Sequence, residues 1–230
     1  MVGLEEQNDN NFTPEKYEKF YEHHYFEPIP EGYALRVNEV IPRFGWAFDQ
    51  IEELKPKTLL DLGCLDGSFA LSVASQLGIS VTGVDLTKDG IQIAKERATT
   101  HKLGATFYQG FAEDWLQDFI DRGITFDVVT FFELIEHVED VQRILKLIDY
   151  VLAPGGSVLV STPDFESPLF GADDEANTCH IRLYTTSKED YERSNKYGTV
   201  RKATSIYKEI GEERIKELSV HNELINLRYT

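Results

Sequence analysis

Residues 58–69 read Thr-Leu-Leu-Asp-Leu-Gly-Cys-Leu-Asp-Gly-Ser-Phe, and this stretch decides the fold. An apolar run carries an acid at Asp61, and two glycines follow at Gly63 and Gly67. Ser68 then opens a segment with apolar residues at helical spacing. This order predicts a buried parallel strand, a tight turn and a helix. In open α/β sheets, such a corner at the carboxyl end of the first strand is where nucleotides bind.

From residue 57 onward, strand patterns and helix patterns alternate, which predicts an α/β fold with a parallel sheet. Strands are expected near 57–62, 80–84, 105–108, 126–132 and 157–162. Helices are expected near 67–78, 88–102, 113–122 and 139–152. The breaker Ala-Pro-Gly-Gly at 153–156 stands ahead of the fifth strand, as a helix-to-strand connection requires.

The start of the chain predicts helices outside this alternation. Residues 1–54 are expected to form a tail and an N-terminal helical cap. One helix is expected to begin at Thr13, where a threonine precedes a proline at the first helical position. A second is expected from Ala34 to Leu54, with an interruption near Pro42.

The end of the chain has the weaker pattern. Residues 55–230 are expected to form the core, with a long loop near 165–180 that contacts substrate. A helix is expected near 186–197, because a threonine and a serine precede three charged residues there. The segments around Gly211 are expected to form a hairpin that completes the sheet, although strand and helix patterns compete there.

Composition limits the partners and the compartment. The net charge is −17, from 40 acidic residues against 23 Lys and Arg, which disfavours a nucleic-acid substrate and favours a small neutral or cationic one. No apolar run approaches the roughly 18 residues of a membrane span. The first ten residues are polar and acidic, unlike a signal peptide, and two cysteines make no disulfide framework. A cytoplasmic protein is expected, and its oligomeric state is left open.

Further motifs follow the first in order. Asp85 ends the second expected strand, about 20 residues past the glycine turn, where an acid can accept hydrogen bonds from both ribose hydroxyls. Leu86 comes next and would lie against an adenine face. The alternative is an ordinary acid at a strand end. The dinucleotide fingerprint is absent, because Leu65 stands where its second glycine would fall, and this disfavours a nucleotide-dependent dehydrogenase.

Residues 57–164 resemble the class I S-adenosylmethionine (SAM) methyltransferases. The motifs that carry the resemblance are the Asp-x-Gly-x-x-x-Gly turn, Asp85, the strand at 126–132 and the Pro-Gly-Gly breaker. The resemblance implies a Rossmann-like, mostly parallel seven-stranded sheet with helices on both faces. The residues it implies for SAM are Asp61, Gly63, Cys64, Gly67, Asp85, Leu86, Ala112, Glu113 and Phe132. Ala112 and Glu113 match the family's adenine contacts, although acids there also suit a helix start.

A Glu-x-x-Glu-His sequence supplies the candidate chemistry. Glu133, Glu136 and His137 can share one face of a turn, and two carboxylates with an imidazole suit Mg²⁺, Mn²⁺ or Zn²⁺. With a fourth ligand at His180, the set resembles that of metal-dependent O-methyltransferases, among them small-RNA 2′-O-methyltransferases, and a similar motif occurs in ubiquinone-pathway enzymes. His137 as a general base without metal, assisted by Glu136, and a non-catalytic role are the alternatives.

The prediction is an enzyme that transfers a methyl group from SAM to a hydroxyl oxygen of a small molecule. Two alternatives remain: an RNA 2′-O-methyltransferase, favoured by the Glu-x-x-Glu-His motif and opposed by the acidity, and a non-catalytic SAM-binding partner subunit. The sequence does not identify the methyl acceptor, because specificity in such a fold lies outside the shared core.

Overall fold

The computed structural model describes residues 28–166, 180, 182–189, 191–194, 200–211, 215–221 and 224–229. The helix expected at Thr13 and all but the ends of the loop at 165–180 lie outside these residues. Within them, no helix is long and apolar enough to cross a membrane.

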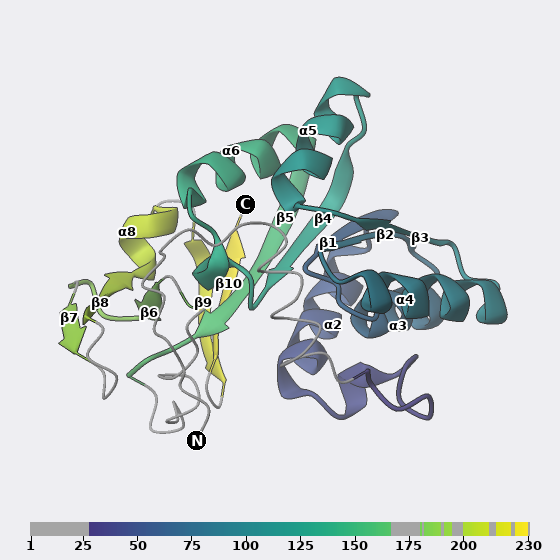
Figure 1. Cartoon of the computed structure of the whole chain (residues 1–230), viewed down its shortest axis with the longest axis horizontal. Helices are drawn as coiled ribbons and strands as arrows, with labels where there is room; N and C mark the ends of the chain where they lie inside the picture. The colour runs from purple at the N-terminus through teal and green to yellow at the C-terminus, as the bar shows by residue number, and fades with distance from the viewer. Residues whose placement is uncertain are drawn as a thin grey trace, which may run out of the picture.

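One sheet forms the centre of the molecule (Figure 1). Its five parallel strands lie in the order β3-β2-β1-β4-β5. Their bounds are β1 Thr58–Leu62, β2 Ser80–Asp85, β3 Ala105–Gln109, β4 Phe126–Phe132 and β5 Leu152–Pro163. The strand order reverses between β1 and β4, the kind of position where open α/β sheets place ligands.

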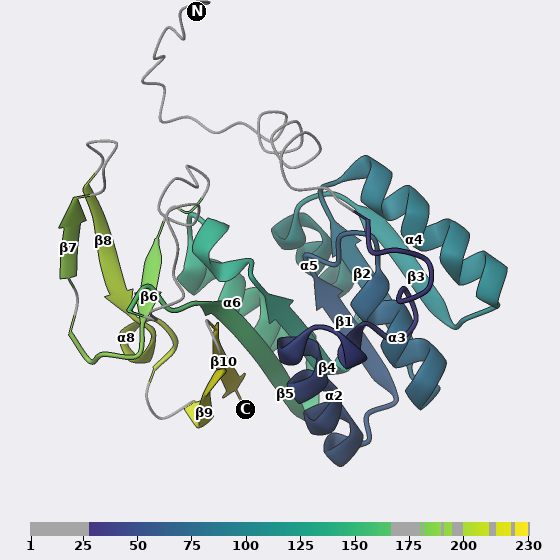
Figure 2. The same cartoon turned by 90° about the horizontal axis from the view of Figure 1, so that it is seen from below.

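Helices cover both faces of the sheet (Figures 1 and 2). One core contains buried residues of α5 (Ala112–Asp121) and α6 (Val141–Val151). The other contains residues of α2 (Pro42–Leu54), α3 (Ser68–Leu77) and α4 (Lys88–His101). Alternation along β1 explains the two layers, because successive side chains of a strand point to opposite faces. Leu59 packs with α3, whereas Leu60 packs with α6.

The expected helix at 34–54 is interrupted as predicted. A 3₁₀ turn, η1, spans Val37–Glu39, and α2 begins at Pro42, the first position of the helix. Proline is tolerated there because the first N–H groups of a helix have no intrahelical partner. Buried residues of α2, among them Trp46 and Ile51, join the core beneath the sheet.

The C-terminal part differs from expectation in one element. The predicted helix at 186–197 is wrong, because β7 (Tyr191–Ser194) lies there and pairs with β8 (Val200–Ser205). The hydroxyl of Thr185 accepts the Ser187 N–H, so these residues make a turn rather than a helix cap. With β6 (Leu183–Thr185), the strands form a small sheet at the far end of the molecule from α4 (Figure 2).

The expected hairpin is present, but Gly211 does not lie at its turn. A short helix, α8 (Ile206–Ile210), ends before Gly211. The strands β9 (Ile215–His221) and β10 (Leu224–Tyr229) follow, and β10 pairs antiparallel with β5. The expected seven mostly parallel strands are therefore five parallel strands, to which β10 and β9 add two antiparallel ones.

Close packing behind the glycine turn generates a first prediction. A Cβ atom at Gly83 of β2 would lie 2.5 Å from Cδ1 of Phe107 and 2.8 Å from Sγ of Cys64. Both neighbours are buried. Gly83→Ala is therefore expected to lower the free energy of unfolding by about 1–3 kcal/mol. Denaturant unfolding measures this change.

The matched control is Gly104→Ala, because a Cβ atom there would meet no heavy atom within 4 Å. We expect this variant to keep or slightly raise the free energy of unfolding. Equal effects of the two substitutions would contradict the packing argument.

Candidate functional site

A cavity of about 650 Å³ opens at the carboxyl ends of the parallel strands. Cavities of 300–1,000 Å³ are typical of small-molecule and cofactor sites. Every site residue expected from the sequence lines it except Gly67. The expected residues that line the cavity are Asp61, Gly63, Cys64, Asp85, Leu86, Ala112, Glu113, Phe132, Glu133, Glu136, His137 and His180.

Asp85 holds the loop after β1 in place. Its Oδ2 accepts the N–H of Leu65 at 2.8 Å, and its Oδ1 accepts the N–H and hydroxyl of Thr87 at 2.8 and 2.7 Å. Leu65 has a left-handed backbone with φ +46°, which a leucine adopts only at some cost. Burial raises the pKa of Asp85, and the hydrogen bonds from Thr87 and Leu65 oppose this. The loop conformation thus depends on the acid expected at the ribose.

Asp61 lies near the carboxyl end of β1 and lines the cavity. Its Oδ1 accepts the hydroxyl of Thr130 from β4 at 2.6 Å. Burial raises the pKa of Asp61 to about 7, and the negative charge of Asp85 adds to the shift. A cationic ligand group beside Asp61 would favour its ionised form.

Gly67 is closely packed and Cys64 is buried. Gly67 has φ +71°, and a Cβ atom there would lie 2.8 Å from Cβ of Ala94 and 2.9 Å from the ring of Phe107. The glycine therefore lets α3, α4 and β3 approach one another and does not line the cavity. Burial raises the pKa of the Cys64 thiol well above its ordinary value, which disfavours the reactive thiolate.

Helix α2 adds two cavity residues that the sequence analysis missed. Phe44 stacks on Phe69 with ring centroids 4.8 Å apart and lies 6.0 Å from Phe132. Arg43 places its guanidinium over the Phe44 ring, and its buried Nε has no hydrogen-bond partner among the described residues. No motif marks either residue, because α2 reaches the cavity through tertiary packing.

Acidic and imidazole groups gather where the chain after β4 lines the cavity, near enough to Arg43 for its charge to oppose the rise in the pKa of Glu136. Glu136 and His137 belong to the 3₁₀ turn η2 (Ile135–His137), and Nε2 of His137 lies 3.9 Å from Oε1 of Glu136. The rings of His137 and His180 have centroids 4.9 Å apart. One potential ligand atom from each of these three residues lies within 4.8 Å of the others. Glu133 does not join this cluster, and its carboxylate accepts the hydroxyl of Ser161 at 2.7 Å.

Glu136 is the buried member of the cluster. Its Oε2 accepts the hydroxyl of Thr162 at 3.1 Å, whereas its Oε1 is buried without a hydrogen-bond partner among the described residues. Burial raises the pKa of Glu136 well above its ordinary value, and the charge of Glu133 adds to this. A buried polar atom without a partner is costly and in a native site indicates an ion, a water or a ligand.

Arg182 brings His180 to the cluster. Its backbone N–H donates a hydrogen bond to the carbonyl of Glu136 at 3.3 Å, and its guanidinium donates to the carbonyls of Val138 and Glu139. The chain after the long loop is thereby fastened to η2, which places His180 beside His137 although 42 residues separate them in the sequence.

The comparisons with known proteins agree with this fold. Residues 54–217 match the family described as "Methyltransferase domain", and the chain belongs to that family. A SAM-dependent methyltransferase from Clostridium acetobutylicum has a similar fold, with a TM-score of 0.55 at 12% identity over 92% of this chain and 97% of that one. The PH0226 protein from Pyrococcus horikoshii gives a TM-score of 0.53 at 20% identity, over 88% of this chain and 99% of that one.

Two sequence relatives share one name. The ubiquinone biosynthesis O-methyltransferase of Serratia proteamaculans is 34% identical over 60% of this chain and 52% of the relative. The protein of the same name from Aeromonas salmonicida is 33% identical over 57% of this chain and 54% of the relative. The chain thus matches about half the length of these relatives.

The raised pKa of Asp61 predicts a pH-dependent stability. The carboxyl ionises near pH 3.8 when exposed and near 7 in the folded protein. Its contribution to stability is therefore full below about pH 4 and is lost as the pH rises toward 7. Between pH 5 and 6, the stability of the wild type should fall relative to Asp61→Asn by about 1.4 kcal/mol, and the slope should decrease to about half as the pH reaches 7.

Denaturant unfolding at several pH values, without ligand, measures this difference. Asp127→Asn is the control, because backbone N–H bonds from Lys57 and Thr58 lower the pKa of Asp127, so that it titrates below this window. Its profile should run parallel to that of the wild type between pH 5 and 7. A parallel profile for Asp61→Asn would contradict the prediction.

Proposed function

We propose that this protein transfers the methyl group of SAM to a hydroxyl oxygen of a small molecule. The observation that carries the proposal is one cavity that combines the expected nucleotide residues with the group Glu136, His137 and His180. The names of the sequence relatives support O-methylation. The aromatic side chains of Phe44 and Phe132 favour a planar acceptor.

The cofactor is proposed to lie along the carboxyl ends of β1, β2 and β3. Asp85 would accept hydrogen bonds from the ribose, and Ala112 with Glu113 would contact the adenine. Asp61 suits the cationic methionine end, because an ammonium favours an ionised carboxylate. Arg43 suits the methionine carboxylate, because it lines the cavity and a guanidinium binds carboxylates well.

His137 is proposed to take the acceptor's proton. The hydroxyl oxygen attacks the sulfonium methyl in line, the carbon–sulfur bond breaks with its electron pair left on sulfur, and the hydroxyl proton passes to an imidazole nitrogen. The protein contributes mainly by aligning acceptor and cofactor and by accepting this proton. Glu136, 3.9 Å from Nε2 of His137, is placed to stabilise the resulting imidazolium.

A metal ion fits the same group of residues. Glu136, His137 and His180 offer one oxygen and two nitrogens, and Oε1 of Glu136, which has no hydrogen-bond partner among the described residues, supports a cation there. Two imidazoles favour Zn²⁺ or Mn²⁺ over Mg²⁺. When bound, such an ion lowers the pKa of a coordinated hydroxyl. Glu133, the other expected ligand, lies outside this group of three, and its carboxylate accepts the hydroxyl of Ser161.

Calorimetry tests the cofactor site at Arg43. Replacing the guanidinium removes a charged hydrogen bond worth about 1.5–3 kcal/mol. Arg43→Gln should therefore weaken SAM binding about 10- to 100-fold. Arg36→Gln is the control, since Arg36 is an exposed arginine that pairs with Glu39 outside the cavity. Equal affinity of SAM for Arg43→Gln and the wild type would contradict this role of Arg43.

A second experiment tests the acceptor side. We expect a catechol to be methylated with SAM, and His137→Ala to lower kcat by about 100-fold or more while SAM affinity changes little. Methyl transfer is followed by mass spectrometry, with and without EDTA and added Zn²⁺, Mn²⁺ or Mg²⁺. Loss of activity in EDTA and recovery with one ion would support the metal. Failure to bind SAM would overturn the proposed function.

A further inference from the structure

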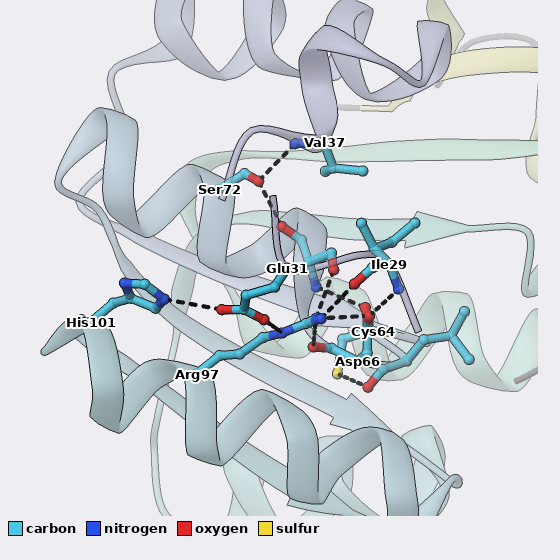
Figure 3. A network of polar contacts seen from close by, with 10 residues as sticks. Ile29, Glu31, Val37, Cys64, Asp66, Ser72, Arg97 and His101 are labelled. Atoms are coloured by element: carbon cyan, nitrogen blue, oxygen red, sulfur yellow. Dashed lines mark hydrogen bonds and ion pairs between the residues drawn. The ribbon is translucent and has the colours of Figure 1, made fainter. Parts of the chain in front are cut away.

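Arg97 of α4 lies at the centre of a buried polar network beside the cavity (Figure 3). Its Nη1 donates to Oδ2 of Asp66 at 2.8 Å and to Oγ of Ser68 at 3.1 Å. Its Nη2 donates to the carbonyl of Ile29 at 2.6 Å, and its Nε to Oε2 of Glu31 at 3.0 Å. One side chain thus joins α4, the loop after β1 and the segment 28–31.

The ion pair of Arg97 and Asp66 holds Ile29 by both of its backbone groups. Asp66 accepts the Ile29 N–H at 2.8 Å, while Arg97 bonds the Ile29 carbonyl. Asp66 also accepts the Ser68 N–H at 3.1 Å, at the start of α3. Because Ile29, Asp66 and Ser68 all line the cavity, the ion pair fixes part of the cavity wall.

The segment has further attachments on its outer side. The Nε2 atom of His101 lies 3.3 Å from Oε1 of Glu31, whose side chain is 65% exposed. Farther along, the N–H of Val37 donates to Oγ of Ser72 at 3.1 Å. Proline at positions 28 and 30 fixes the backbone φ on both sides of Ile29, which reduces the conformational freedom of the free segment.

We propose that residues 28–31 form a strap along the cofactor cavity and that Arg97 is the positioning residue that fastens it to the loop after β1. The inference rests on the proposed function in that SAM is the occupant. The strap and the loop share the Asp66 carboxylate, so loosening the strap also loosens the loop. Release of cofactor is then slowed by the same network that orders the loop.

An arginine suits this task better than a lysine. Its planar guanidinium presents five N–H donors in a fixed arrangement, and here they reach Asp66, Ser68, Ile29 and Glu31 at once. A lysine at 97 would keep the charge but could not make these contacts together. The variant Arg97→Lys therefore separates the geometry of the network from its charge.

The rate of S-adenosylhomocysteine dissociation, measured by stopped-flow displacement, tests the proposal. We expect Glu31→Gln to raise this rate about two- to fivefold, because it removes one partly exposed ion pair. Arg97→Lys should raise it about tenfold or more. Glu39→Gln is the control, since Glu39 is an exposed acid of the same region that pairs with Arg36. Wild-type rates for both Glu31→Gln and Arg97→Lys would overturn the proposal.

Hydrogen exchange in the empty protein tests the strap without cofactor. Prolines carry no N–H, so Ile29 and Glu31 supply the exchanging amides of residues 28–31. Exchange of the Ile29 amide should be slow in the wild type and at least about tenfold faster in Arg97→Lys. Equally fast exchange of the Ile29 amide in the wild type and in Arg97→Lys would overturn the proposed strap. If the wild type binds no cofactor but Ile29 exchanges slowly in it and faster in Arg97→Lys, the proposed function fails and the fastening by Arg97 stands.

Discussion

The site depends on how two buried carboxylates hold the loop that follows β1. Asp85 accepts the N–H of Leu65, and Asp66 accepts those of Ser68 and Ile29. Leu65 has a left-handed backbone without being glycine, so the loop needs these bonds to keep its shape. The start of α3, the wall at Ile29 and the position of Asp85 all follow from this one arrangement.

Local charge in the cavity differs from the charge of the whole chain. The net charge of −17 predicts cationic or neutral ligands, and the acids Asp61, Asp85 and Glu136 agree with that. Arg43 introduces a positive group into the same cavity. A zwitterionic ligand with both an ammonium and a carboxylate matches this distribution better than a simple cation. Net charge therefore constrains the partners less than the placement of single residues does.

Contacts with distant strands decide the conformation of two segments whose local pattern is ambiguous. The hydroxyl residues at 185–187 resemble a helix cap, but β7 follows them, because pairing with β8 satisfies its backbone groups instead. The acids Glu133 and Glu136 resemble a shared ligand set, but Glu133 has a left-handed backbone and bonds Ser161. In each case a local pattern allowed two conformations, and contacts with distant strands selected one.

The sequence by itself determined the alternating strands and helices, the glycine turn and the acids at the strand ends. These are local signals, since the periodicity of hydrophobic residues and the backbone constraints of glycine and proline are visible within a few residues of sequence. The tertiary structure alone decided the rest of the site. His180 reaches His137 because Arg182 binds η2, Arg43 enters the cavity because α2 packs on α3, and Arg97 meets Asp66 across 31 residues of chain. Such contacts are set by how packed elements meet in space, which no periodicity along the chain records.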